Sequence, residues 1–145
     1  MKNKKAKKSQ FDINSQEIIK VLSIDEVRKM LPKVQYKYVK ILRNGTESKK
    51  GEYVIIDGIR VSFRRIVSHF KLPMVCAATG KKADHYILYR KKDGSVHLDL
   101  FTEDKELLTI DHVKPIAKGG KDRIENMSLM TFEKNVEKSD KYVEA

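Results

Sequence analysis

The chain has 145 residues, of which 40% are hydrophobic, with 31 Lys and Arg against 20 Asp and Glu. This length suits one domain, or a small domain with an extension, around a modest core. No apolar run approaches the roughly 18 residues of a membrane span, and the basic N-terminal segment leads into no apolar core of a secretory signal. The single cysteine, Cys76, excludes an internal disulfide and favours a reducing, cytoplasmic location.

The positive charge is distributed unevenly along the chain. The formal net charge is +11; up to Leu72 there are 18 basic and 7 acidic residues, and after it 13 of each. A local excess of this size attracts a polyanion and releases its counterions on binding. Nucleic acid is therefore the expected partner, although a merely solubilising role stays open for the first ten residues.

The first part of the chain predicts a basic arm followed by short elements. Residues 1–14 hold five lysines and few large apolar residues, so we expect a basic arm without fixed structure. Ser23 and Glu26 have capping-box spacing, which predicts a short helix that ends before Pro32. Residues 36–42 suggest a strand, closed by a turn-rich segment at 44–51.

The next segment alternates arginines with apolar residues. Residues 52–56 and 59–67 are expected to be extended runs joined by a turn at 57–58, and the second run also partly fits a helix. Arg60, Arg64 and Arg65 form either a solvated basic face or a phosphate-contacting surface, and the charge excess favours phosphate contact. We therefore expect residues 15–72 to be a basic DNA-binding region of mixed α/β structure.

From residue 73 the pattern changes to strands and one helix. A hairpin is expected around the KKDGS turn, then a strand, a Gly-Gly loop, a second strand and a Glu- and Lys-rich helix. In residue numbers these elements are 86–90, 96–101, 107–113, 119–120, 126–130 and 131–142. The closing order is strand, loop, strand, helix.

Four polar residues in this part form a chemical set. Asp111 and His112 end an apolar run, Asn126 follows the basic Gly-Gly loop, and Asn135 lies in the expected helix. Any one of them is unremarkable in a turn or helix. Together they offer oxygen ligands for a hard divalent ion and an imidazole that can activate water, which favours phosphodiester hydrolysis.

The stretch DHVKPIAKGGKDRIENMSLMTFEKN resembles the HNH endonucleases, in particular the small phage-type enzymes, and the similarity extends over roughly residues 75–141. The resemblance implies the ββα-metal fold. It also implies that Asp111 and Asn135 bind the ion, that His112 is the general base, and that Asn126 holds the loop that orients this base. Mg²⁺ or Mn²⁺ is the expected ion, because such ions accept oxygen ligands and, in the case of Mg²⁺, retain several waters.

Further residues receive weaker assignments. His97 lies in a strand similar to one that precedes the motif in the family, so a supporting role behind the site is one possibility. His85 belongs to a second Asp-His pair without a Gly-Gly loop and is interpreted as a surface or strand residue, whereas His69 follows an apolar run and is interpreted as structural. Four loop cations either hold neighbouring phosphates or form a solvated loop: Lys114, Lys118, Lys121 and Arg123.

The chain departs from many relatives at the structural zinc site. Where those relatives have two Cys-x-x-Cys pairs, this chain has residues 76–79, CAAT, and 131–134, TFEK. Three of the four thiolates are missing, so no structural zinc is expected and Cys76 is interpreted as a small buried residue.

The sequence thus predicts an α+β protein with a basic arm (1–14), a basic N-terminal DNA-binding region (15–72) and an HNH nuclease module of the ββα-metal type (73–145). The resemblance implies metal-dependent cleavage of DNA to 5′-phosphate and 3′-hydroxyl ends. The alternative is a catalytically inactive HNH-fold protein that only binds nucleic acid. RNA as substrate, nicking against double-strand cutting, homing against general phage DNA processing, and monomer against homodimer stay open.

Overall fold

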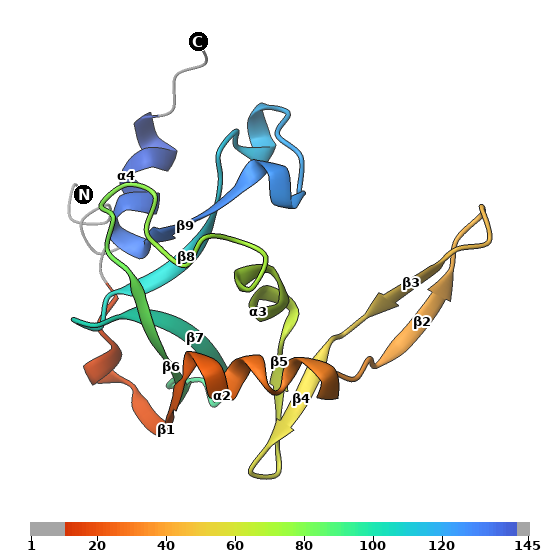
Figure 1. Ribbon diagram of the computed structural model, residues 1–145, viewed down its shortest axis with the longest axis horizontal. Coiled ribbons are helices and arrows are strands. Elements are labelled where there is room, and N and C mark those ends of the chain that lie inside the picture. Colours follow the sequence, from red (N-terminus) through yellow and green to blue (C-terminus); the bar gives the residue numbers. More distant parts are fainter. Residues whose placement is uncertain (1–10, 142–145) are drawn as a thin grey trace.

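The computed structural model describes residues 11–141, and the side chains of residues 11–138. Its centre is a curved five-stranded antiparallel sheet (Figure 1). In spatial order the strands are β1 (Glu17–Ser23), β6 (Ala83–Arg90), β7 (Val96–Thr102), β8 (Leu107–His112) and β9 (Met127–Thr131). The protein is therefore an α+β chain that consists mainly of strands, and β6 to β9 follow one another as a meander.

Two separate hairpins lie between β1 and β6 in the chain. They consist of β2 (Tyr38–Ile41) with β3 (Glu47–Lys50), and of β4 (Tyr53–Ile56) with β5 (Ile59–Ser62). Figure 1 shows the β2–β3 hairpin extending away from the five-stranded sheet, whereas the β4–β5 hairpin lies at its base next to the main body.

Between residues 11 and 141 the structure also has three short α-helices and four 3₁₀ turns. The helices are α2 (Ile24–Arg28), α3 (Arg64–His69) and α4 (Phe132–Lys141), and the turns are η1 (Ile13–Ser15), η2 (Leu31–Lys33), η3 (Ile116–Lys118) and η4 (Ile124–Asn126). Among residues 11–141, no helix is long and apolar enough to cross a membrane.

The expected capping box at α2 is confirmed. The Ser23 hydroxyl accepts a hydrogen bond from the Glu26 amide at 3.0 Å, and the Glu26 carboxylate accepts one from the Ser23 amide at 2.8 Å. Both bonds satisfy amide groups that the first turn of a helix leaves without partners. The helix consequently begins where the sequence predicts.

The core lies on both faces of the sheet, because successive strand residues point to opposite sides. On β6, Tyr86 and Leu88 belong to the larger cluster, which β4, β5 and α3 help to form, whereas Ile87 and Tyr89 belong to a smaller cluster with Ile13. Each fully buried side chain of this size contributes roughly 1.5–3 kcal/mol. The two clusters fix the meander that carries the candidate site.

The structure confirms most of the expected elements in the C-terminal half. The hairpin around KKDGS, the strand before the Gly-Gly loop, the strand after it and the closing helix are all present as β6–β7, β8, β9 and α4. The run at 59–67 divides into a strand and a helix, β5 and α3, so the expectation of a partly helical run is also confirmed.

Two strands were not expected from the sequence. Residues 17–23 form β1, whose register with β6 shifts between Ile18 and Lys20. This β-bulge breaks the period-two alternation on which strand prediction depends. The interpretation of 44–51 as a turn is wrong, because residues 47–50 form β3; the Asn44-Gly45 pair is the hairpin signal that should have indicated it.

The expected basic arm ends earlier than residue 14. Ile13 is buried, and the Phe11 ring packs 5.9 Å from that of Tyr89, so residues 11–14 belong to the folded body. Residues 1–10 of the arm lie outside the described residues. The division into regions 15–72 and 73–145 stays a prediction, although the pairing of β1 with β6 joins both parts in one sheet.

Candidate active site and nucleic-acid interface

The Asp-His pair lies at the end of β8, in the ladder with β9. Asp111 pairs with Ser128 and His112 with Met127, so the backbone of both residues is fixed by the sheet. Asp111 is buried, at 5% exposure. His112 is half-buried and reaches a solvent-accessible cavity. Since neighbouring strand residues point to opposite faces, the carboxylate and the imidazole face different surroundings.

The buried Asp111 carboxylate is held by a lysine from α4. The Lys138 ammonium donates to Asp111 Oδ1 at 3.2 Å and to Oδ2 at 3.0 Å, and also to the backbone carbonyls of His112 (3.0 Å) and Val113 (2.9 Å). Charge-assisted hydrogen bonds to a buried carboxylate fix its position strongly. This role of Lys138 was not expected from the sequence, although its position three residues after Asn135 places it on the same side of a helix.

Asn126 fastens both ends of the loop that follows β8. Its side-chain oxygen accepts from the Lys114 amide at 2.9 Å, and its Nδ2 donates to the carbonyls of Lys114 (2.9 Å) and Lys121 (2.8 Å). The Asn126 side chain thus accepts one hydrogen bond and donates two, and these bonds satisfy backbone groups that have no partner in a regular element. This geometry supports the loop-holding role that the resemblance implies for Asn126.

The Gly-Gly pair has a steric explanation. Gly119 adopts a left-handed conformation, with φ of 92°, where it ends the 3₁₀ turn η3. A Cβ on Gly120 would overlap the carbonyl oxygen of Lys114, because the two backbones approach closely there. The pair therefore allows the loop to fold back on the end of β8, which places the next residues beside His112.

One of these residues is Asp122, which lies next to the His112 ring. His112 Nε2 lies 2.9 Å from Asp122 Oδ1, across ten chain positions. A carboxylate accepts hydrogen bonds, so it favours the tautomer in which Nε2 carries the proton and Nδ1 has the lone pair. Asp122 follows the Gly-Gly pair by two positions, and its contact with His112 was not expected from the sequence.

Asn135 lies on α4 and reaches β8 two residues before Asp111. Its Nδ2 donates to the Thr109 hydroxyl at 2.9 Å, and that hydroxyl donates to the Met130 carbonyl at 3.0 Å. Thr109 and Asp111 share one face of β8, because strand side chains alternate. The helix thus presents an amide beside the strand face that carries the carboxylate.

These donors suit a hard ion in type. A carboxylate and an amide carbonyl are oxygen ligands of the kind that Mg²⁺ and Mn²⁺ accept, and a Mg²⁺ ion commonly retains waters at its other positions. Within residues 11–141, no group of three or more His, Cys, Asp and Glu side chains lies together as a metal cluster. In donor type alone, Asp111 and Asn135 fit a hard ion of the magnesium kind.

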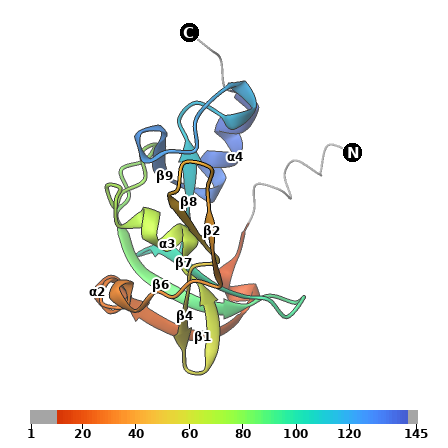
Figure 2. The ribbon, with the colours of Figure 1, turned by 90° about the vertical axis from the view of Figure 1, so that its right-hand side faces the viewer.

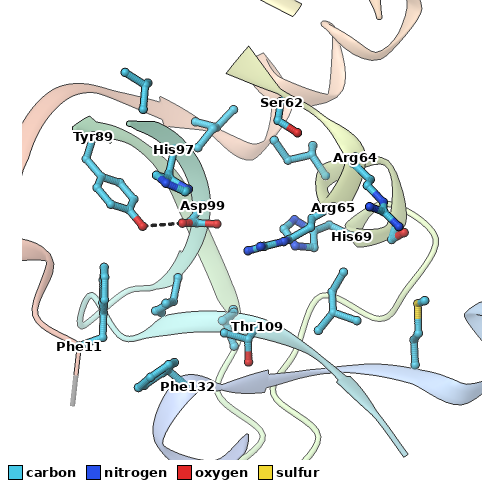
Figure 3. A pocket seen from close by; sticks show the side chains of 18 of the residues that line it. Phe11, Ser62, Arg64, Arg65, His69, Tyr89, His97, Asp99, Thr109 and Phe132 are labelled. Carbon is cyan, nitrogen blue, oxygen red and sulfur yellow. Dashed lines mark hydrogen bonds between the residues drawn. The ribbon is translucent and has the colours of Figure 1, made fainter. Parts of the chain in front are cut away.

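A cavity of about 800 Å³ lies where β7 and β8 separate (Figure 3). The two strands pair only at Leu100 with Leu108 and at Phe101 with Leu107. Beyond these pairs β7 continues with β6 and β8 with β9, so the sheet forks. The cavity occupies this fork and reaches His112.

The α3 arginines enter the same cavity. Arg64 and Arg65 line it opposite β8, and Figure 3 shows the Arg65 side chain directed into it. Arg60 instead stacks over the Tyr53 ring at 4.4 Å. The four loop cations lie in the segment between β8 and β9, where Lys114 is half-buried and Lys118, Lys121 and Arg123 are exposed. Tertiary structure thus places two of the three predicted arginines on the wall of the cavity that His112 also lines.

His97 contacts the wall of the cavity. Its ring stacks on Tyr89 at 5.8 Å, and its Nε2 lies 3.1 Å from the Ser95 hydroxyl. Tyr89 in turn donates to Asp99 at 2.6 Å, and burial together with this carboxylate raises the pKa of Tyr89. These contacts assign His97 to the β7 wall, so its support of the site stays a prediction.

The other two histidines have structural contacts. His69 is buried and lies 3.0 Å from the Tyr86 hydroxyl; burial, assisted by Arg65, lowers the pKa of His69 to about 4. His85 lies on β6 with Nδ1 2.9 Å from Asp84. The interpretation of His69 as a structural residue and of His85 as a strand residue agrees with these positions.

The two segments that replace the zinc motifs contact each other directly. Cys76 is buried, as expected, and its sulfur accepts a hydrogen bond from the Thr131 amide at 3.4 Å. The Ala77 amide also donates to the Leu129 carbonyl at 2.8 Å. Backbone bonding and packing therefore connect these segments, while the expected absence of zinc stays a prediction.

Comparison with known proteins identifies one family. Residues 99–140 match the family model described as HNH endonuclease, a range that contains Asp111, His112, Asn126 and Asn135. No curated protein and no solved structure matches the chain. The match confirms the resemblance that the motif indicates, for the segment from β7 to α4.

Proposed function

We propose, from the premise that residues 99–140 are an HNH domain, that this chain is a divalent-metal-dependent DNA endonuclease. In this proposal β8, β9 and α4 are the ββα-metal unit. The observation that carries it is that Asp111, His112 and Asn135 lie on these elements, while Asn126 fixes the loop between the two strands by hydrogen bonds to Lys114 and Lys121.

Asp111 and Asn135 would hold the ion. Mg²⁺ or Mn²⁺ bound there would stabilise negative charge on the scissile phosphate and on the departing oxygen. The buried position of Asp111 would strengthen this interaction, because fewer waters compete for the carboxylate.

His112 would act as the general base. Asp122 would keep the proton on Nε2, because a carboxylate accepts hydrogen bonds, and the lone pair of Nδ1 would then accept a proton from the attacking water. Asn126 keeps the loop, and therefore Asp122, in place. Asp122 is thus a positioning residue that acts through His112.

The fork cavity would receive the substrate strand. It joins His112 to Arg64 and Arg65, so a phosphodiester beside the imidazole would have neighbouring phosphates within reach of guanidinium groups. The exposed loop cations would hold phosphates on the other side of the cleaved bond. In this arrangement the basic region before residue 73 supplies affinity and the HNH domain supplies the chemistry.

One observation favours the alternative, a protein that binds DNA without cutting it. The Lys138 ammonium already contacts both oxygens of Asp111, so it neutralises the carboxylate that would hold the ion. An ion would have to share this carboxylate or displace the lysine. Cleavage and metal binding therefore need separate measurements.

The decisive experiment is plasmid relaxation with the purified chain, with Mg²⁺ or Mn²⁺ and with EDTA. We expect nicking with the ion and none with EDTA. Relaxation that continues in EDTA, or intact plasmid under every metal condition, contradicts the proposal. Parallel incubation with matched DNA and RNA duplexes determines the substrate.

Calorimetric titration of the metal separates the two functions. Lys138→Met removes the ammonium that would compete with the metal ion for Asp111, and it keeps an unbranched side chain of nearly the same length. We expect this variant to bind Mn²⁺ more tightly than the wild type, and Asp111→Asn to bind it much more weakly. A wild type that binds no Mn²⁺ but binds DNA supports the non-cutting alternative.

A further inference from the structure

The β2–β3 hairpin is the part of the molecule that the HNH domain does not explain. We call residues 36–50 the ribbon. Figure 1 shows it extending beyond the five-stranded sheet, and in Figure 2 it points toward the viewer. At its base the Lys37 amide donates to the Lys50 carbonyl, and just before the ribbon Gln35 pairs with Tyr53 of the β4–β5 hairpin.

The ribbon is exposed despite its large apolar and aromatic residues. Tyr38 is 56% exposed, Val39 47% and Ile41 62%, and the main core cluster contains no residue from 36–50. A two-stranded hairpin alone is marginally stable in water. Exposed apolar area of this kind indicates a surface that contacts a partner.

The charge of the ribbon identifies the class of partner. It contains five basic side chains and one acidic one, Glu47. The basic residues are Lys37, Lys40, Arg43, Lys49 and Lys50. A second copy of this chain would bring two such ribbons together against charge repulsion, whereas a polyanion is attracted. The composition therefore favours nucleic acid over self-association.

The two faces of the ribbon differ. Tyr38 pairs with Lys50, and Lys40 with Ser48, so these side chains share one face, which has two ammonium groups, a phenol and no carboxylate. We call it the basic face. The opposite face carries Glu47, and there the Lys49 ammonium lies over the Tyr36 ring at 5.1 Å. The basic face is the surface that fits phosphates.

The path of the chain connects this face to the candidate site. The ribbon leads directly into the β4–β5 hairpin and then α3, whose Arg64 and Arg65 line the cavity that reaches His112. A two-stranded β-ribbon fits the major groove of B-DNA, whereas the A-form major groove of RNA is too narrow for it. A duplex cleaved at His112 would thus extend past α3 to the ribbon.

We propose that the ribbon inserts into the major groove of duplex DNA beside the cleaved position, with its basic face on the phosphates. This inference rests on the proposed function for its substrate, DNA, and it adds an interface outside the HNH domain. If this inference is right, affinity for duplex DNA depends on the cations of the ribbon and much less on lysines elsewhere on the surface.

The test measures binding of a fluorescent DNA duplex in EDTA, so that cleavage plays no part. The ribbon variant combines Lys40→Gln, Arg43→Gln and Lys50→Gln. We expect its affinity to fall roughly 10- to 100-fold, and the slope of log K against log salt to become shallower by about 0.9 for each phosphate that the variant no longer neutralises. Thermal unfolding should be unchanged, because all three side chains are exposed.

A matched control removes the same charge from exposed lysines elsewhere on the chain. It combines Lys33→Gln, Lys82→Gln and Lys92→Gln. We expect only a small loss of affinity from this control, and near wild-type binding from a variant with Lys40→Arg and Lys50→Arg. The preference of the wild type for DNA over a matched RNA duplex should disappear in the ribbon variant alone.

The outcomes separate the two proposals. If the wild type does not bind duplex DNA, the proposed substrate and the ribbon inference both fail. If the wild type binds and nicks DNA but the ribbon variant behaves like the control, only the ribbon inference is wrong. If light scattering shows a dimer that Ile41→Lys dissociates, the ribbon is a surface for a second copy and the DNA inference is overturned.

Discussion

The β8–β9–α4 unit and the ribbon are built on opposite physical principles. In the first, the buried Asp111 carboxylate accepts hydrogen bonds from the Lys138 ammonium, and Asn126 fixes both ends of a loop. In the second, the side chains are exposed and the backbone ladder between β2 and β3 is the main connection. One region depends on the placement of single atoms, and the other on the density of charge.

This difference teaches what a substitution should do in each region. Where the site is built from specific interactions, the removal or addition of one atom changes geometry, so the effect is large and depends on the residue. Where the surface is built from charge, single changes have small effects that add and that salt can screen. The following predictions test this contrast, from the largest expected effect to the smallest.

His112→Ala should abolish nicking while leaving DNA binding nearly intact. Removal of a general base typically costs about 10²–10⁴-fold in rate. The rate of plasmid relaxation and the affinity for a duplex in EDTA measure the two properties separately. His85→Ala is the matched control, because it disrupts the other Asp-His pair, in which Nδ1 lies 2.9 Å from Asp84. Equal loss in both variants would contradict the role of His112.

Acid should destabilise the fold through His69, which lies on α3 between the two regions. The pKa of His69 is about 4 in the folded chain, below the ordinary 6.5, because burial opposes its charge. The unfolded chain therefore binds the proton first, and stability is lost as pH falls from about 6.5 to about 4. The expected loss from this group is about 3 kcal/mol.

Urea unfolding near neutral pH and near pH 4 measures this loss. His69→Gln does not titrate and keeps an acceptor for the Tyr86 hydroxyl. We expect the pH dependence of its free energy of unfolding to be smaller than that of the wild type by the same amount. An unchanged pH dependence would show that folding does not lower the pKa of His69.

Two glycine substitutions compare the regions directly. Gly120→Ala should cost about 2–3 kcal/mol, because its Cβ would overlap the Lys114 carbonyl and force the loop away from His112. Gly45→Ala, at the tip of the ribbon, has no atom within 4 Å of its Cβ, and its φ of +84° costs about 1 kcal/mol. Chemical denaturation gives both values, and the reverse order would contradict the contrast.

Asp122→Asn should slow nicking about 10-fold and change its pH profile, because the imidazole loses the carboxylate that selects its tautomer. A purely structural loss would lower the rate equally at every pH. Asp93→Asn is the control, since Asp93 is an exposed turn carboxylate that accepts hydrogen bonds from Ser95. A pH profile identical to that of the wild type would show that Asp122 has no part in orienting His112.

The sequence predicted the local features well, because local rules determine them. The capping box at Ser23, the KKDGS hairpin and the order of strand, loop, strand and helix after residue 107 all depend on neighbours within a few positions. The strands β1 and β3 were not predicted. A β-bulge breaks the alternation of β1, and neither face of β3 is buried in a core.

The sequence alone also determined which residues are candidates for the site. The residue types and spacing of Asp111, His112, Asn126 and Asn135 can be recognised without knowing the fold. Only the tertiary structure decided their partners. Lys138 meets Asp111 across 27 positions, and the fork between β7 and β8 brings α3 to the cavity of His112. Such contacts depend on how strands pair and separate, which the pattern of one chain does not encode locally.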